Sequence, residues 1–463
     1  MVLAAGAGTR MRSRLPKVLQ PLSGRPILGH ILHALHDAGL RETVVVTGHA
    51  EPEVRAGATQ FCPPGMALTF ANQAQPLGTG HAVRQARDQI RTPSVLIVNG
   101  DLGLLRPDQV RAVATAAGPA DEGPVAGAGA AIAVATATVP DPTGLGRIVR
   151  AEDGLIGAIV EEALVDNETR AIGEINVGLY RFETAWLWSA LDALEASATG
   201  EAYLGDVLTK AIAEGLATVP VPVDLSDGLL NIENKRDLAR AEQVMRRRIV
   251  DRHLSNGVTI VDPATAYIDA DVGIGADTVI EPGCHLRGAT TLGAECTVGP
   301  NAVIRDTRVG AGCELVGCTI TGSTLGERVD VGPYTTVRSG TFLDDHVHLG
   351  THAETKNAHL QTGVRVGHFS YIGDAEIGAR TNIGAGAITC NFDGETKHRT
   401  VIGEDAFIGS DSLLIAPLTI GDGARTGAGS VVNRDVPTGG SVVGSPARSV
   451  RGRERVQGGG ADA

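Results

Sequence analysis

The strongest constraint on the fold is a short repeat in the C-terminal half of the chain, in which an aliphatic residue followed by glycine recurs at a step of six. Examples are Leu292-Gly293 with Val298-Gly299, Val366-Gly367 with Ile372-Gly373, and Ile402-Gly403 with Ile408-Gly409. No helix has this period, whereas a coil of three short strands does: the aliphatic residue points inward and glycine takes the corner. A β-sandwich is the alternative, but its turns fall about 8–12 residues apart and irregularly. The repeat therefore predicts a left-handed parallel β-helix.

Size and composition bound what the rest of the chain can be. At 463 residues the chain is too long for one ordinary core, so we expect two domains. The net charge of −13 and the lack of a long basic tract argue against a nucleic-acid partner. No apolar run reaches the about 18 residues needed to span a membrane, and the N-terminus lacks the features of a signal peptide. The six cysteines show no metal spacing, which favours a reducing cytoplasm.

The sequence predicts four segments. A charged stretch with helical periodicity, ENKRDLARAEQVMRRRIVDRHL, separates the repeats from the N-terminal half. We therefore expect an N-terminal domain over residues 1–230, a connecting helix over 231–254, the β-helix over 255–450 and a disordered tail over 451–463. The basic cluster in the connecting helix is interpreted as a solvated face.

The N-terminal half opens on a glycine-rich turn after a short apolar strand. Gly6 and Gly8 let backbone N–H groups approach a phosphate, and Arg10 and Lys17 add positive charge. Neither the Walker A pattern nor the dinucleotide-binding fingerprint is present. Hydrophobic strands alternate with helical stretches in this half, which predicts a Rossmann-like α/β domain. We expect a mostly parallel sheet that binds its ligand at the carboxyl ends of the strands.

Several strings, in order, resemble the nucleotidyltransferases that join a sugar 1-phosphate to a nucleoside triphosphate. These are LAAGAGTRM with LPKVL, Asn72-Gln73 before PLGTGHAV, LIVNGD ending at Asp101, DPTGLGRI, IVEE and EINVGLY. In the repeat region, GHFSYIGDAEIGARTNIGAGAITCNFDGETKHRT over residues 367–400 is the most specific match. The whole chain thus resembles the bifunctional bacterial GlmU family, an N-acetylglucosamine-1-phosphate uridylyltransferase fused to a glucosamine-1-phosphate N-acetyltransferase.

The resemblance implies both an activity and an assembly. Glucosamine 1-phosphate would be acetylated from acetyl-CoA and then coupled to UTP with Mg²⁺, giving UDP-N-acetylglucosamine and pyrophosphate. The family forms homotrimers that share active sites between chains, so a homotrimer is expected.

The same resemblance assigns the N-terminal site. The implied nucleotide-binding residues are Leu3, Ala4, Ala5, Gly6, Arg10, Lys17, Gln73, Gly78 and Thr79, the metal ligands are Asp101 and Glu233, and the sugar site is lined by Gly146, Glu161 and Asn176. Nucleotidyl transfer needs charge neutralisation at the α-phosphate and a divalent metal held by oxygen ligands. No covalent intermediate is required.

The resemblance also assigns the C-terminal site. Acetylating an amine needs a base, and His368 has a suitable intrinsic pKa. On composition alone a histidine at a coil corner is more often structural. The implied sugar-phosphate ligands are Arg338, Lys356, Tyr371, Asn382 and Lys397, and the implied acetyl-CoA contacts are Ala385, Asn391, Phe392, Ser410 and Ala428. Glu354 is expected to orient His368, and a backbone N–H near Ala385 to bind the oxyanion.

Departures from the family pattern cluster in the N-terminal half. The chain starts two residues before LAAG, which predicts a weak first strand or a misassigned start. The metal loop NGDLGLL lacks a proline, Ala163 stands where a basic residue is common, Gly205 where threonine is usual, and Glu233 where asparagine is usual. The departure VRSG in the C-terminal half spares Arg338. Two alternatives stay open: a specialised relative with altered or lost nucleotidyl transfer, and a non-catalytic regulatory assembly. Nucleotide and sugar preference cannot be assigned from the sequence.

Overall fold

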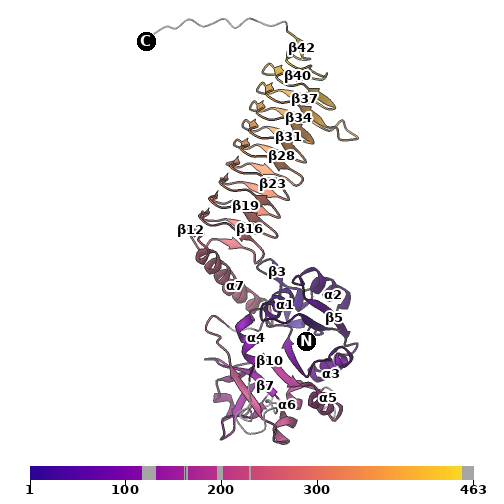
Figure 1. Ribbon diagram of the computed structural model, residues 1–463, viewed down its shortest axis with the longest axis vertical. Helices are drawn as coiled ribbons and strands as arrows, with labels where there is room; N and C mark the ends of the chain where they lie inside the picture. Colours follow the sequence, from indigo (N-terminus) through magenta and orange to yellow (C-terminus); the bar gives the residue numbers. More distant parts are fainter. Residues whose placement is uncertain (117–131, 161, 163–164, 195–201, 229–230, 451–463) are drawn as a thin grey trace. The chain divides into compact units, whose positions relative to one another are not determined.

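The computed structural model describes residues 1–116, 132–160, 162, 165–194, 202–228 and 231–450. The chain divides into two compact units, residues 1–245 and 246–463 (Figure 1). The first contains helices and a mixed sheet, and the second is a stack of short strands. The expectations for Glu161, Ala163 and the tail over 451–463 fall outside the described residues.

A nine-stranded sheet forms the centre of the first unit, counted over the described residues. Its main path runs β11 (Thr218–Pro222), β7 (Ile132–Thr138), β10 (Glu174–Glu183), β6 (Ser94–Asn99), β1 (Val2–Leu3), β4 (Glu42–Thr47) and β5 (Ala67–Asn72), with β8 (Arg147–Arg150) on β10 and β9 (Ile156–Val160) on β8. The first strand is short but central, because Val2 lies opposite Val45 on one side and Val98 on the other.

The expectation of a mostly parallel sheet is corrected by the strand directions. Strands β6, β1, β4 and β5 are parallel, but β10 pairs antiparallel with β6, β7 and β8, and β8 pairs antiparallel with β9. The parallel strands are joined through helices, whereas β8 and β9 follow one another as neighbours in the sheet without a crossover helix, and such neighbours pair antiparallel. The sheet is therefore parallel on the side of β1 and largely antiparallel around β10.

Helices cover both faces of this sheet and make two hydrophobic cores. Helices α1 (Ile27–Asp37), α2 (Glu51–Gln60) and α4 (Pro107–Ala114) pack into one core, and α3 (Thr79–Gln85), α5 (Thr184–Asp192) and α6 (Leu204–Ala213) pack into the other. Along α1, Ile27, Ile31 and Leu35 recur at helical spacing and are buried. The two residues of β1 face opposite sides, since Val2 lies in the first core and Leu3 packs against the second.

The segment between β1 and α1 is irregular and folds back on itself. It contains the 3₁₀ turns η1 (Thr9–Met11) and η2 (Lys17–Leu19) and the short hairpin of β2 (Pro21–Leu22) and β3 (Arg25–Pro26). Two further 3₁₀ turns, η3 (Arg87–Gln89) and η6 (Thr169–Ala171), lie elsewhere in this unit. Gly8 has a φ of +60°, and a Cβ there would lie 2.5 Å from Cβ of Lys17. Glycine therefore permits the close approach that brings Lys17 back beside the turn.

Helix α7 (Lys235–Ser255) precedes the coils of the second unit. One face of the coils holds β12 (Thr259–Ile260), β15 (Val279–Ile280), β18 (Thr297–Val298), β21 (Glu314–Leu315), β24 (Asp330–Val331), β27 (His348–Leu349), β30 (Arg365–Val366), β33 (Asn382–Ile383), β36 (Phe407–Ile408), β39 (Arg425–Thr426), β41 (Ser441–Val443) and β42 (Arg448–Ser449). A second face holds β13 (Tyr267–Ile268), β16 (His285–Arg287), β19 (Val303–Arg305), β22 (Thr319–Thr321), β25 (Thr336–Val337), β28 (Glu354–Lys356), β31 (Tyr371–Gly373), β34 (Ile388–Cys390), β37 (Leu413–Ile415) and β40 (Val431–Val432). The third holds β14 (Gly273–Ile274), β17 (Thr291–Leu292), β20 (Arg308–Val309), β23 (Thr324–Leu325), β26 (Phe342–Leu343), β29 (His359–Leu360), β32 (Ala375–Ile377), β35 (Thr400–Ile402) and β38 (Leu418–Ile420).

These three parallel sheets confirm the predicted left-handed β-helix, with one strand of each face per coil. Asp330 and His348 lie side by side on one face and are 18 residues apart in the chain. The aliphatic member of each repeat is buried, as at Leu349, Val366 and Ile383. One coil is longer: Arg380 binds Asp405 across 25 residues, because the segment from Asn391 to Arg399 is inserted between β34 and β35.

Candidate active sites

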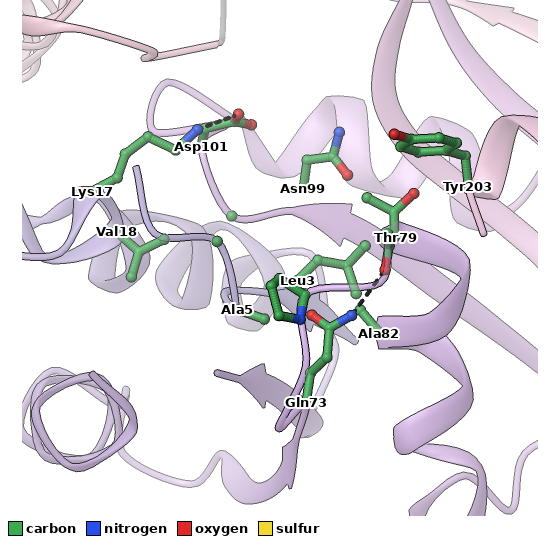
Figure 2. Close-up of a pocket in the computed structure, with 14 residues that line it drawn as sticks. Leu3, Ala5, Lys17, Val18, Gln73, Thr79, Ala82, Asn99, Asp101 and Tyr203 are labelled. Carbon is green, nitrogen blue, oxygen red and sulfur yellow. Dashed lines mark hydrogen bonds and ion pairs between the residues drawn. The ribbon is translucent and has the colours of Figure 1, made fainter. Parts of the chain in front are cut away.

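A cavity of about 320 Å³ lies in the first unit at the carboxyl ends of the parallel strands (Figure 2). Its walls come from the turns after β1, β5 and β6 and from the start of α6. The lining residues are Leu3, Ala5, Gly6, Lys17, Val18, Gln73, Pro76, Gly78, Thr79, Ala82, Asn99, Gly100, Asp101 and Tyr203. This edge is where open α/β sheets bind their ligands.

Two basic and two acidic side chains meet at one end of this site. The Nζ of Lys17 lies 2.9 Å from Oδ2 of Asp101 and 3.3 Å from Oε2 of Glu233. The same Glu233 oxygen accepts from the guanidinium of Arg10 at 2.7 Å, and the Arg10 side chain is 71% exposed. The structure therefore brings together four of the predicted residues, although Arg10 and Glu233 do not line the cavity itself.

The charges in this cluster perturb one another. Burial alone would lower the pKa of Lys17, but the carboxylates of Asp101 and Glu233 more than offset this and hold its pKa above the ordinary value. Burial also raises the pKa of Glu233, and the nearby Asp101 carboxylate adds to the rise, while Lys17 and Arg10 oppose it. Two carboxylates held this close together form a site that gains from a further cation.

Asp101 and Glu233 fit a divalent cation of the Mg²⁺ type. Within the described residues, Oδ1 of Asp101 is buried and has no hydrogen-bond partner. No group of three or more His, Cys, Asp or Glu side chains able to hold a metal occurs in that part of the chain. Mg²⁺ is usually held by one or two carboxylates together with substrate phosphates and water, so two carboxylates suffice.

The other end of the cavity is formed by backbone and amide groups. The Gln73 Nε2 donates to the carbonyl of Gly78 at 2.9 Å, and the Thr79 hydroxyl accepts from the backbone N–H of Leu204 at 2.9 Å. Ala4 differs from its predicted neighbours. Its side chain lies in the hydrophobic core and its N–H donates to the Val46 carbonyl, because alternate residues of the strand face opposite sides. Ala4 contributes no side-chain contact to the cavity.

The two predicted sugar-site residues that the structure describes, Gly146 and Asn176, lie next to each other outside this cavity. The backbone N–H of Asn176 donates to the Gly146 carbonyl at 2.9 Å, and the Asn176 amide donates to the Tyr180 hydroxyl at 2.8 Å. Asn176 still pairs with Thr136 on β7, and the register of β10 shifts in the segment between Asn176 and Tyr180. Gly178 within this bulge has the Asn99 amide directly over it.

Sequence reasoning missed several residues that line the cavity. Asn99 ends β6 two residues before Asp101, and Figure 2 shows it between Asp101 and Tyr203. Tyr203 precedes α6 and Pro76 belongs to the turn after β5. The position of Asn99 at the carboxyl end of a strand was the available signal. No pattern in the sequence pointed to Tyr203 or Pro76.

In the β-helix, three predicted cations gather on the face that contains β28 and β31. Lys356 and Gly373 are register partners, and Arg338 follows β25 one coil before Lys356. The ammonium of Lys397, brought in by the inserted segment, lowers the pKa of Lys356, and Arg338 acts in the same direction. The Tyr371 hydroxyl lies over Gly373, in the place that a Cβ would take. Fixed cations beside a hydroxyl suit a phosphate ester.

His368 lies at the corner between β30 and β31, which is also the corner of three predicted acetyl-CoA residues. A Cβ on Gly367 would lie 2.6 Å from the Ala385 nitrogen, one on Gly384 would lie 2.5 Å from the Ser410 nitrogen, and one on Gly409 would lie 2.6 Å from the Ala428 nitrogen. His368, Ala385, Ser410 and Ala428 therefore occupy the same corner in four successive coils. The Ala385 N–H makes no hydrogen bond within the described residues.

The remaining predicted residues are placed differently. Asn382 pairs with Arg365 and Phe407 on the face containing β33, so the corner separates it from Lys356 and Tyr371. Asn391 is buried and its amide donates to the Asp374 carboxylate, whereas Phe392 is 58% exposed. Within one chain, the predicted acetyl-transfer residues are therefore distributed over two faces of the coils and the corners between them.

The expected contact between Glu354 and His368 is absent. Glu354 instead accepts from the Arg338 guanidinium at 3.0 Å. In the described part of the chain the His368 ring has no hydrogen-bond partner, and its Nδ1 lies beside Gly350 of the preceding coil. The Glu354 carboxylate is thus paired with a cation on its own face.

Comparison with known families matches both units. Residues 1–166 match the MobA-like NTP transferase domain, residues 294–382 match the GlmU-like C-terminal hexapeptide, and residues 271–306 and 399–434 match the bacterial transferase hexapeptide. No helix among the described residues is long and apolar enough to cross a membrane.

Relatives cover nearly the whole chain. The bifunctional protein GlmU of Mycobacterium sp. (strain KMS) is 42% identical over 96% of this chain and 88% of its own length. The GlmU proteins of Mycolicibacterium gilvum and Ralstonia nicotianae are 42% and 41% identical over 98% and 95% of this chain, and over 90% and 94% of their own lengths. Identity at this level over both domains shows an enzyme with a nucleotidyltransferase domain and a hexapeptide acyltransferase domain, which excludes the non-catalytic assembly. The chain belongs to the GlmU family of bifunctional transferases.

Proposed function

We propose that the protein acetylates glucosamine 1-phosphate from acetyl-CoA and then joins the product to UTP, releasing pyrophosphate and UDP-N-acetylglucosamine. One observation carries the proposal: the chain contains two separate sites that each suit a sugar phosphate. In the first unit Lys17, Asp101 and Glu233 meet beside a cavity at the strand ends. In the second unit, one face of the coils holds the cations Arg338, Lys356 and Lys397. This face meets the face of Asn382 at the corner that holds His368.

His368 is the proposed base for acetyl transfer. The attacking amine must lose a proton, and an exposed imidazole accepts it near neutral pH. The unpaired N–H of Ala385 lies one coil further along the same corner and would stabilise the oxyanion that forms on the thioester carbonyl. The coenzyme would run along this corner over Ser410 and Ala428, with Asn391 and Phe392 at the next corner.

The cations beside Tyr371 are the proposed anchor for the phosphate of the acceptor sugar. The charge of Lys397, followed by that of Arg338, repels the Lys356 ammonium and lowers its pKa, and a phosphate relieves that repulsion. Arg338 is held by Glu354 with its guanidinium beside this group. The site is thus arranged for an anion before the substrate arrives.

In the first unit, Lys17 and Arg10 are proposed to face the triphosphate, and Gln73, Gly78 and Thr79 the nucleoside. Asp101 and Glu233 would hold Mg²⁺, which neutralises phosphate charge when bound. Lys17 at present balances both carboxylates, so it is free to move toward a phosphate once a cation joins them. Gly146, Asn176 and Glu161 are proposed for the sugar.

Asn382 supports a shared acetyl-transfer site. A coil corner separates Asn382 from Lys356 and Tyr371 within one chain, and a site shared with a second copy would accommodate this separation. We therefore propose a homotrimer with acetyl-transfer sites between chains, working in the cytoplasm. Sedimentation equilibrium should give about three times the chain mass of 47.7 kDa. A monomer that acetylates its substrate would contradict the shared site.

The departures near the nucleotide site favour a second candidate, a relative with altered nucleotide or sugar specificity. Gly205 lies in the first turn of α6, two residues after Tyr203 of the cavity wall. The test is pyrophosphate release by the purified protein with Mg²⁺, UTP and N-acetylglucosamine 1-phosphate, beside dTTP and other sugar phosphates. Turnover with the first pair supports the principal proposal. Turnover only with another pair supports the specialised relative.

A further inference from the structure

We propose that His81 is a positioning residue that fixes the amide of Gln73, so that the nucleotide cavity selects uracil over cytosine. The inference rests on the proposed function, because it takes the pyrimidine to lie against Gln73. His81 lies outside the cavity wall, and its contact with Gln73 gives a physical reason for the choice of base.

The Gln73 amide is held by two acceptors. Its Nε2 donates to the Gly78 carbonyl at 2.9 Å and lies 3.0 Å from Nδ1 of His81 (Figure 2 shows the first of these bonds). A carbonyl oxygen can only accept, so the group facing Gly78 is the NH₂. The same NH₂ faces His81, and therefore Nδ1 of His81 accepts. Both hydrogens of the Gln73 amide are then used.

The proton of the neutral His81 ring consequently lies on Nε2. That nitrogen is 3.1 Å from the Gln85 amide on the outer side of the ring. Gln85 is half-buried, and its NH₂ also lies 3.2 Å from the His81 backbone carbonyl; turning this amide over gives up that hydrogen bond and presents the oxygen to Nε2–H. Burial, followed by the charge of Arg84 on the same helix, lowers the pKa of His81, which keeps the ring neutral near pH 7. Hydrogen-bond donation then runs from Gln73 to both Gly78 and His81, and from His81 to Gln85.

Fixing the NH₂ leaves the Oε1 of Gln73 as the group that faces the ligand. Gln73 lines the cavity, and no described residue donates to this oxygen. Uracil presents N3–H, a donor that matches an acceptor, whereas the unprotonated N3 of cytosine is itself an acceptor. Two acceptors that face each other in a partly buried site lose a hydrogen bond and repel, so cytosine is rejected.

Without His81 the amide loses the partner that fixes its orientation on that side. In a His81→Ala variant, one hydrogen of the Gln73 NH₂ has no acceptor and only the Gly78 carbonyl still holds the amide. Turning the amide over to offer its NH₂ to the N3 of cytosine then costs one hydrogen bond instead of two. A His81→Asn variant keeps an acceptor, because the Oδ1 of asparagine stands close to the position of the histidine Nδ1. Asparagine should therefore rescue the selectivity that alanine loses.

The test is the ratio of UTP to CTP affinity, measured by calorimetry on the full chain with Mg²⁺. We expect wild type to prefer UTP, His81→Ala to reduce the preference at least about tenfold, mainly by tighter CTP binding, and His81→Asn to restore most of it. Asp88→Asn, an exposed change shortly after the same helix, is the control and should keep the wild-type ratio. Acetyl transfer by each variant reports whether the protein is intact.

The outcomes separate the inference from the proposed function. An unchanged UTP-to-CTP ratio in His81→Ala, or equal loss of both nucleotides without rescue by asparagine, overturns the positioning role while uridylyl transfer stands. A wild-type protein that binds CTP as well as UTP overturns both the positioning role and the selectivity. A protein that selects UTP through His81 but does not transfer it keeps the inference and contradicts the proposed reaction.

Discussion

The Lys17 ammonium lies 2.9 Å from Oδ2 of Asp101, while Oδ1 of the same carboxylate is buried with no partner among the described residues. A carboxylate with one oxygen neutralised and the other vacant is arranged for a second cation. An Asp101→Asn change removes that charge. We expect a loss of about 10²–10³ in nucleotidyl transfer, the usual scale for an electrostatic group in the transition state. Pyrophosphate release is the measurement. Asp88→Asn, an exposed change, is the control, and acetyl transfer should not change.

Glu233 and Asp101 both pair with the Lys17 ammonium. The Glu233 carboxylate also pairs with Arg10 and is more exposed than that of Asp101. Replacing it by asparagine keeps an oxygen ligand and removes one negative charge. We expect the Mg²⁺ concentration for half-maximal nucleotidyl transfer to rise by several-fold, with turnover at saturating Mg²⁺ largely kept. A magnesium titration of pyrophosphate release measures this. An unchanged requirement would show that Glu233 is not a ligand.

His368 is the proposed base at its corner, and His352 occupies the same corner one coil earlier. His368→Ala should reduce acetyl transfer by about 10²–10⁴, the range for a general base. His352→Ala is the matched control because its ring stacks on Tyr334 and has no proposed chemical role. Thiol release from acetyl-CoA is the assay. Equal losses in the two variants would contradict the assignment.

Lys397 reaches the sugar-phosphate face from the inserted segment and lowers the pKa of Lys356. Lys397→Ala should therefore raise the pKa of Lys356 toward its ordinary value and weaken phosphate binding. We expect the KM for glucosamine 1-phosphate to rise about tenfold or more, while the KM for acetyl-CoA changes little. Steady-state kinetics with each substrate varied in turn decides this. A larger effect on acetyl-CoA would assign Lys397 to the coenzyme.

His253 near the end of α7 is 3% exposed, and burial followed by the charge of Arg252 lowers its pKa from 6.5 to about 4. The folded state therefore favours the neutral ring. Its contribution is fully present above about pH 6.5 and is lost as the pH falls toward 4, up to about 3 kcal/mol.

Calorimetry at pH 7.5 and pH 5.0 measures the thermal midpoint of the β-helix at both values. The midpoint should fall less on acidification in His253→Gln than in wild type, since glutamine cannot take up the proton. A midpoint that falls equally in the two proteins would contradict this role for His253.

The two halves of the fold differ in how far the sequence determines them. The six-residue repeat alone predicts the β-helix, because each coil pairs with its neighbour and the pattern is local. The antiparallel pairing of β10 with β6 and β7 had no local signal, since it joins Leu179 to Val98 and Phe182 to Ile132 across long stretches of chain. Strand direction there depends on connections that a periodicity does not encode.

The contacts within the candidate sites were also only partly predictable from the sequence. The meeting of Lys17 with Asp101 follows from motifs at two strand ends. That Ala4 faces the core could have been predicted from strand alternation. The pairing of Glu354 with Arg338 instead of His368 could not, because it joins residues 16 positions apart that only the stacking of the coils brings together. The string GHAV contains His81, but its contact with Gln73 appears only in three dimensions.

One chain is proposed to carry out both transfers in sequence. To test this, the purified protein is supplied with glucosamine 1-phosphate, acetyl-CoA, UTP and Mg²⁺, and the products are followed by mass spectrometry. We expect UDP-N-acetylglucosamine, with one free coenzyme A and one pyrophosphate formed for each molecule. Release of coenzyme A with N-acetylglucosamine 1-phosphate as the end product, and no nucleotide sugar, would contradict it.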